Sequence, residues 1–194
     1  MSVPPTNSIQ PATLADWCAW LEANHPRPEG VWLITYRPAT GKATFTYEQA
    51  VEEALCFGWI DGQAKRLDDE RTMLWYAPRR AGSVWAKSNK ARVARLVADG
   101  RMTPAGQVKI DAAQADGSWS LLDSVDKLEV PADLAAAFAA YPDARANFDA
   151  FPPSARHASL TWIATAKRPE TRAKRVAETA RLAQDNVRAN QPKE

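Results

Sequence analysis

The sequence is poor in the residues that build metal centres and disulfide frameworks. Its 194 residues include only two cysteines, Cys18 and Cys56, and two histidines, His25 and His157. The two cysteines lie far apart in sequence and form no metal-binding or redox motif, so we expect reduced thiols, with Cys56 buried in a core. This composition predicts a cytoplasmic protein without a metal site or a cofactor.

Long apolar runs and recognisable catalytic loops are also missing. No stretch approaches the ~18 apolar residues that a membrane span needs, and the first residues lack the pattern of a secretory signal. The sequence contains no phosphate-binding glycine loop, nucleophile elbow or zinc pattern. We therefore expect no membrane span, and the absence of any nucleic-acid-binding motif argues against DNA or RNA as a partner.

The charge is arranged in blocks, although the net charge is only +2. Residues 79–101 hold seven basic residues and one acidic residue, and residues 167–194 hold eight basic and four acidic residues. Such basic segments can bind an anionic ligand, or they can dock against acidic parts of the same fold. The sequence alone leaves both possibilities open.

The hydrophobic pattern predicts an α+β fold. We expect a flexible tail over residues 1–12, an α+β portion over 13–117, and an all-helical C-terminal portion over 118–194 that packs on it. In the α+β portion, helices are predicted over 13–25, 46–58, 83–100 and 103–116. About three strands, over 31–36, 59–66 and 71–76, form a small antiparallel sheet packed on these helices. Helices opened by prolines follow from residue 131.

Two groups of residues could form a ligand site. In the first, Arg79 and Arg80 precede Ser83, the predicted N-cap of a helix, so free backbone N–H groups and two guanidinium groups would bind an anion. The alternative is that the Arg pair clamps Asp61 or Asp68.

The second group would form a small-ligand pocket if the predicted hairpin folds over the helix start. Its members are Trp59, Asp61, Trp85 and Asn89. The alternative is purely structural, with Asp61 fixing the turn between Gly58 and Gly62 and Asn89 satisfying the backbone of a strand. Together the two groups give a candidate ligand-binding site of seven residues: Trp59, Asp61, Arg79, Arg80, Ser83, Trp85 and Asn89.

Several motifs resemble the YdeI/OmpD-associated family of bacterial proteins. They include the stretch from Glu53 to Gly62, Pro78-Arg79-Arg80, the stretch from Gly100 to Gly106, and a C-terminal pattern from Trp162 to Arg175. This resemblance implies a stress protein linked to bacteriocin protection, and it supplies no catalytic residues.

We therefore expect binding of a small anionic ligand or a protein partner rather than catalysis. The alternatives are an enzyme with a Trp59, Asp61 and Arg79 pocket, in which the pKa of Asp61 would be perturbed, and a nucleic-acid-binding protein.

Overall fold

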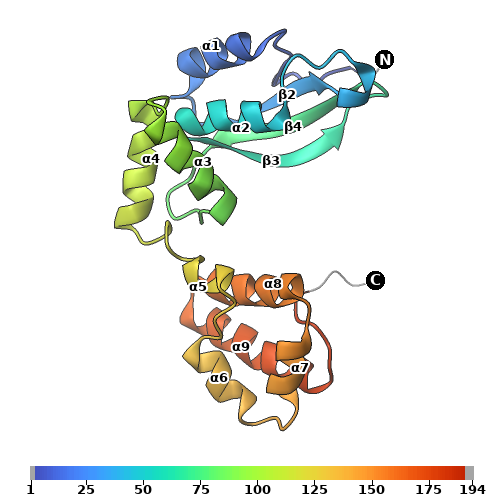
Figure 1. Ribbon diagram of the computed structural model, residues 1–194, viewed down its shortest axis with the longest axis vertical. Helices are drawn as coiled ribbons and strands as arrows, with labels where there is room; N and C mark the ends of the chain where they lie inside the picture. The colour runs from blue at the N-terminus through green and yellow to red at the C-terminus, as the bar shows by residue number, and fades with distance from the viewer. Residues whose placement is uncertain (1–2, 191–194) are drawn as a thin grey trace. The chain divides into compact units, whose positions relative to one another are not determined.

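The computed structural model describes residues 3–190, which divide into two compact units (Figure 1). The first unit contains the described residues up to Ser83 together with Ser88–Ser118. The second unit contains Val84–Lys87 and the described residues from Trp119 onward. Residues 1–2 of the predicted tail and residues 191–194 of the predicted helical portion lie outside the described part of the chain.

The first unit is built around a four-stranded mixed sheet with the strand order β1-β2-β4-β3. The strands are β1 (Ser8–Ile9), β2 (Val31–Tyr36), β3 (Trp59–Arg66) and β4 (Arg71–Pro78). Strand β1 pairs with β2 in parallel, whereas β2 and β3 both pair with β4 in antiparallel orientation. The three strands predicted from the sequence are present, and the α+β fold class is confirmed.

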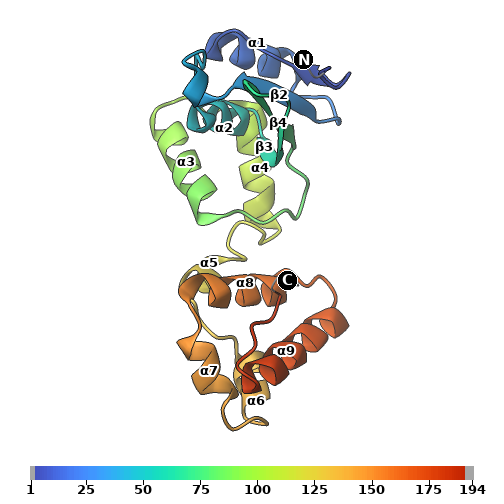
Figure 2. The same cartoon turned by 90° about the vertical axis from the view of Figure 1, so that its right-hand side faces the viewer.

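Two helices of the first unit cover one face of this sheet (Figures 1 and 2). They are α1 (Leu14–Asn24) and α2 (Tyr47–Cys56), and each begins with a complete capping box, at Thr13 and Thr46. The Trp17 indole of α1 donates a hydrogen bond to the carbonyl of Ala50 in α2, over 3.1 Å. The Trp17 ring also packs edge-on against Tyr76 of β4, at 5.2 Å between centroids. This packing places the core of the first unit between the two helices and the sheet.

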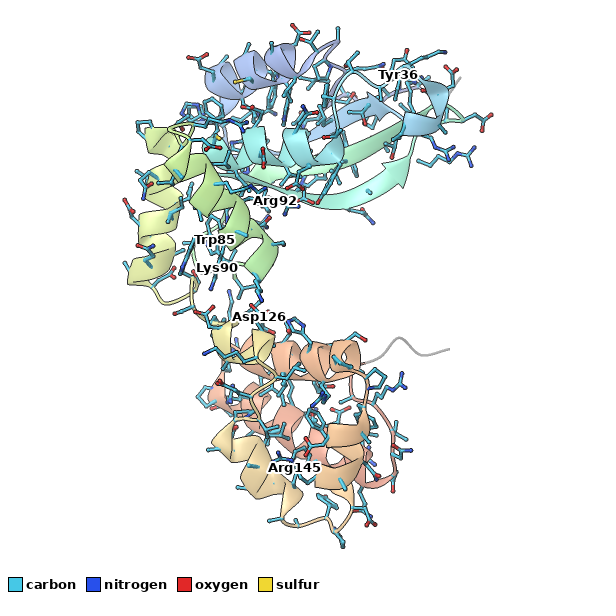
Figure 3. The ribbon with its side chains drawn as sticks, viewed as in Figure 1. Tyr36, Trp85, Lys90, Arg92, Asp126 and Arg145 are labelled. Atoms are coloured by element: carbon cyan, nitrogen blue, oxygen red, sulfur yellow. The ribbon has the colours of Figure 1, made fainter. Side chains whose placement is uncertain are left out.

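The remaining helical segments of this part of the chain complete the first unit. They are the short 3-10 helix η1 (Pro38–Thr40), α3 (Lys87–Ala98) and α4 (Pro104–Ala115). Arg92 of α3 forms an ion pair with Glu48 of α2, at 2.6 Å, and its position can be followed in Figure 3. This ion pair fixes α3 against α2.

The second unit is helical throughout its described residues, as the sequence predicts. Its helices are α5 (Asp123–Asp126), α6 (Ala132–Phe138), α7 (Ala144–Ala150), α8 (Pro153–Ala164) and α9 (Pro169–Gln184). Buried side chains from these helices form one apolar core, in which Phe138 packs against Phe148 and Phe148 packs against Phe151.

The start of α3 differs from the prediction. The helix begins at Lys87 and not after Ser83, because the Ser83 hydroxyl donates back to the carbonyl of Arg80 over 2.7 Å and closes a turn. Trp85 is buried in the second unit, so this residue is unavailable for the first turn of the helix. Within α3, Val93 and Leu96 are buried, whereas Val97 is exposed.

The predicted tail contains a strand. Ser8 and Ile9 form β1, which makes the sheet mixed rather than purely antiparallel. The Trp32 N–H donates to the carbonyl of Asn7 over 3.0 Å, and the Asn7 side chain donates to the carbonyl of Gly30. A two-residue strand next to three prolines carries no periodic signal, which explains why the sequence pattern does not reveal it.

Within residues 3–190, none of the helices has the length and apolar character that crossing a membrane requires. The same residues contain no cluster of three or more His, Cys, Asp or Glu side chains suited to holding a metal ion.

Candidate functional site

The first unit contains a cavity of about 580 Å³ on the sheet face that carries Leu33, Leu74 and Tyr76. Three parts of the chain line it. Strands β2, β3 and β4 form its floor, residues 37–46 between β2 and α2 form one side, and the first turns of α2 contribute Tyr47, Gln49 and Ala50. Its volume lies within the range of about 300–1,000 Å³ that is typical of small-molecule sites.

The register of the strands determines which side chains reach this cavity. Leu33 of β2 lies opposite Leu74 of β4, and Thr35 lies opposite Thr72. Because side chains alternate between the two faces of a strand, these four residues share one face. The floor of the cavity therefore combines aliphatic side chains with threonine hydroxyls.

The segment of residues 37–46 is held in place by polar contacts at its outer side. Lys42 forms an ion pair with Glu70, at 2.6 Å, and its ammonium group lies 5.6 Å from the centroid of the Tyr36 ring. The Thr44 hydroxyl donates to the carbonyl of Ala12 over 2.6 Å. Tyr36, which is labelled in Figure 3, also lines the cavity. These contacts position Phe45 and its neighbours as a wall.

None of the side chains that line the cavity carries a formal charge. The polar groups among them are hydroxyls and one amide, supplied by Thr35, Thr44, Thr46, Thr72, Gln49, Tyr36, Tyr47 and Tyr76. Moving an ion from water into such surroundings is costly when no opposite charge compensates it. The cavity is therefore chemically suited to an uncharged molecule.

The hydroxyls of two lining residues, Tyr47 and Tyr76, lie close to the Asp61 carboxylate. The Tyr47 hydroxyl donates to the Asp61 carboxylate over 2.8 Å. Tyr76 lies directly opposite Asp61 in the β3–β4 pair, and its hydroxyl is buried without a hydrogen-bond partner among the described residues. Burial, followed by the hydrogen bond to Asp61, raises the pKa of Tyr47 to about 12, and burial likewise raises the pKa of Tyr76. Both hydroxyls are consequently protonated at neutral pH.

The structure places the sequence-predicted site residues in different surroundings. The Asp61 carboxylate accepts a hydrogen bond from Tyr47, which lines the cavity, whereas Trp59 is fully buried in the core. The Trp59 indole donates to the carbonyl of His25 over 3.1 Å, and its ring packs edge-on against Trp20. Trp59 therefore supports the fold beneath the site and does not line the cavity.

Arg79 is 5% exposed, and its backbone N–H donates to the carbonyl of Gly58 over 2.9 Å. Burial lowers the pKa of its guanidinium to about 10, while the charge of Asp61 opposes this shift. Arg79 therefore remains charged at neutral pH. Asp68, one of the acidic partners considered for the Arg pair, forms an ion pair with Arg71.

Arg80 and Ser83 belong to an exposed turn and not to a helix start. The Gly82 N–H of this turn donates to the Asp116 carboxylate over 3.0 Å, so an acidic side chain of the same unit occupies this donor. The prediction that a helix starts at Ser83, on which the proposed anion site depends, is therefore wrong. Anion binding by Arg79 and Arg80 themselves stays a prediction.

The last two predicted residues lie in separate units. Trp85 belongs to the second unit, where it is buried and packs against Trp119 at 4.9 Å between ring centroids. Asn89 belongs to the first unit, and its side-chain oxygen accepts a hydrogen bond from Arg92 over 2.7 Å. The partner of Asn89 is thus a side chain, and not the strand backbone that the structural alternative named.

Cys56 is buried, as expected, and burial raises the pKa of its thiol to about 12. The thiol is therefore protonated at neutral pH, which makes it a poor nucleophile.

Comparison with protein families assigns a different model to each part of the chain. Residues 9–109 match the model described as a domain of unknown function, DUF8412, which covers just over half of the 194 residues. Residues 127–186 match the model described as bacteriocin-protection, YdeI or OmpD-associated. The resemblance to this family is therefore confirmed for the second unit, whereas the motifs before residue 109 fall within the first model. Neither the curated proteins nor the solved structures give a match.

Proposed function

The chain belongs to the DUF8412 family and carries a YdeI or OmpD-associated domain in its second unit, and we propose that its first unit binds a small, uncharged, largely apolar molecule. The observation that supports this proposal is the cavity of about 580 Å³, which is lined by uncharged side chains from three segments of the first unit. Ligand binding, rather than catalysis, would then be the biochemical activity of this unit.

The composition of the cavity wall supports the proposal. Apolar side chains such as Leu33, Phe45 and Leu74 supply the surface that an apolar ligand would bury. Burial of such surface contributes about 25 cal/mol per Å² before the costs of association are subtracted. A few hydroxyl groups among apolar side chains are the usual means of orienting a ligand in such a site.

The anionic ligand expected from the sequence has weaker support. Arg79 and Trp59 are buried and neither of them lines the cavity, so no open space next to these two side chains would receive an anion. An anion at this place would require the surrounding segments to move. The two hypotheses predict opposite preferences for a charged ligand, and one pair of probes separates them.

The test is a fluorescence titration with N-phenylnaphthylamine and with anilinonaphthalene sulfonate, two dyes that share a ring skeleton but differ by a sulfonate group. We expect the neutral dye to bind at least about tenfold more tightly, because the cavity offers the sulfonate no counter-charge. Tighter binding of the sulfonate dye would contradict the proposal and favour the anion site.

A matched pair of variants locates the bound dye. Ala64 of β3 lines the cavity from an exposed position, and Ala64→Trp is expected to fill part of the cavity and weaken binding of the neutral dye. Gln63, its neighbour on the same strand, does not line the cavity, so Gln63→Trp serves as the control. Equal binding by both variants, each shown to be folded by circular dichroism, would place the dye elsewhere.

A further inference from the structure

The buried hydroxyl of Tyr76 narrows the class of molecule that the cavity can hold. Tyr76 is 0% exposed and lines the cavity, and its hydroxyl has no hydrogen-bond partner in the described part of the protein. Most buried polar groups are paired, and an unpaired group calls for an explanation such as a bound water or ligand. A molecule in the cavity that reaches this hydroxyl would therefore complete its hydrogen bonding.

The neighbouring groups leave this hydroxyl as a donor. Asp61, which lies opposite Tyr76 across the β3–β4 pair, accepts the hydroxyl of Tyr47 and forms no hydrogen bond with the Tyr76 hydroxyl. The Thr72 hydroxyl, which also lines the cavity, donates to the carbonyl of Lys65 over 2.9 Å. Tyr76 thus differs from Tyr47 and Thr72, because the hydroxyl protons of those two residues have acceptors within the protein.

We infer that Tyr76 donates a hydrogen bond to an acceptor oxygen of the ligand, so that the cavity selects uncharged apolar molecules that carry a carbonyl group. This inference rests on the proposed function. The nearby Asp61 carboxylate repels an anionic acceptor, which favours a ketone, ester or amide oxygen over a carboxylate. A hydrocarbon of the same shape would fill the cavity but leave the Tyr76 hydroxyl unpaired.

The test compares fluorene with fluorenone, two tricyclic molecules of nearly the same shape in which a methylene group is replaced by a carbonyl. Their dissociation constants are measured by displacement of N-phenylnaphthylamine from the wild-type protein and from Tyr76→Phe. A hydrogen bond of ordinary strength predicts that the ratio of the two constants changes about tenfold in favour of fluorene in Tyr76→Phe. The comparison isolates the hydroxyl because the hydrocarbon controls for shape and burial.

Thr72→Val is the matched control, since it removes a lining hydroxyl that is already bonded within the protein. We expect the ratio of the two dissociation constants to stay unchanged in this variant. The inference is overturned if Tyr76→Phe leaves the ratio of the two dissociation constants unchanged, which includes the case in which it weakens the binding of both molecules equally. If fluorene and fluorenone bind but are not discriminated by Tyr76, the inference fails while the proposed function stands. If neither these molecules nor the dye bind the wild-type protein, both fail.

Unfolding of the unliganded protein gives a second readout. Because the Tyr76 hydroxyl has no bonding partner in the described residues, Tyr76→Phe is expected to unfold at the same or a higher urea concentration than the wild type. A clear loss of stability would show that the hydroxyl supports the fold, and it would overturn the assignment to a ligand.

Discussion

Tyr47 and Tyr76 place the same phenol group at one cavity, but the fold gives their hydroxyls different surroundings. Tyr47 is the first residue of α2 and about half exposed, and its hydroxyl is engaged by Asp61. Tyr76 belongs to β4 and is fully buried, and its hydroxyl lacks a protein partner among residues 3–190. One hydroxyl is therefore satisfied by the protein, whereas the other is available to a ligand.

The Tyr47–Asp61 pair predicts a late titration of one tyrosine. Since the pKa of Tyr47 is raised to about 12 in the folded protein, the unfolded chain ionises first as the pH rises above about 10. The contribution of Tyr47 to stability is therefore complete below pH ~10 and is lost as the pH rises towards ~12. The ultraviolet absorbance of phenolate, recorded after rapid pH jumps, measures this ionisation.

Tyr47→Phe should remove an absorbance step near pH 12 from this titration. Asp61→Asn should move that step to lower pH, because it removes the negative charge that opposes ionisation of Tyr47. An unchanged absorbance step in both variants would refute the assignment of this step to Tyr47 next to Asp61.

Two arginines of α9, from the basic C-terminal segment, contact neighbouring helices of the second unit. The Arg175 guanidinium donates to the carbonyl of Trp162 at the end of α8 and lies over the Trp162 ring, 5.1 Å from its centroid. Arg172 forms an ion pair with Asp133 of α6, at 2.7 Å. Cations at the last carbonyls of a helix are stabilised by its dipole. These two arginines therefore join α8, α9 and α6.

Replacement of Arg175, which caps the C-terminal end of α8, should destabilise the second unit. Arg175→Ala is expected to lower the free energy of unfolding by about 1.5–3 kcal/mol, because it removes a charge-assisted hydrogen bond and a cation–π contact. The exposed neighbour Lys174 provides the control, and Lys174→Ala should change stability by less than about 0.5 kcal/mol. Urea unfolding followed by circular dichroism measures both. Similar losses in the two variants would show that the cap contributes little.

Most elements could be predicted from the sequence because their signals are local. The capping box at Thr46 marks the start of α2, and Thr103 followed by a proline marks the start of α4. The start of α3 could not be predicted, because burial of Trp85 in the second unit overrides the local preference of Ser83 for an N-cap. Tertiary packing decides this boundary.

The cavity could not be predicted from the sequence either, because tertiary structure brings its lining residues together. Its wall combines single residues such as Thr35, Phe45, Ala64 and Thr72, which are brought together by strand register and form no motif in sequence. Asp61 could be selected because it stands between glycines and aromatics, and it does contact the cavity-lining Tyr47. The partner of Asp61 could not be predicted, because the contact joins residues from different elements.

The molecule consists of two units that are not consecutive in sequence. Val84–Lys87 belongs to the second unit, although it is flanked on both sides by chain of the first unit. Within this short segment, Val84 packs against the core of the second unit and Trp85 packs against Trp119. The second unit therefore depends on residues that precede its main sequence by more than thirty positions.

Trp85→Ala should consequently destabilise the second unit although it lies within the sequence of the first. The loss of a buried indole is expected to cost about 3–5 kcal/mol. Hydrogen-exchange mass spectrometry should show faster exchange in α6 to α9 than in β2 to β4. Val97→Ala, at an exposed position on α3, is the control. Faster exchange confined to the first unit would contradict this dependence.

The placement of Val84–Lys87 also bears on how such a protein can evolve. A gene fusion that joined two ready-made modules at a single junction would leave each module's core encoded by one uninterrupted stretch. Here the family match over residues 9–109 includes Trp85, whose indole packs in the unit that carries the other match, over 127–186. Exchange of the first half for that of a distant relative would therefore bring Trp119 together with a foreign residue at position 85, and exchange of the second half would bring Trp85 together with a foreign residue at position 119. The two halves must change together at this contact, and recombination between them is penalised even where each half folds well.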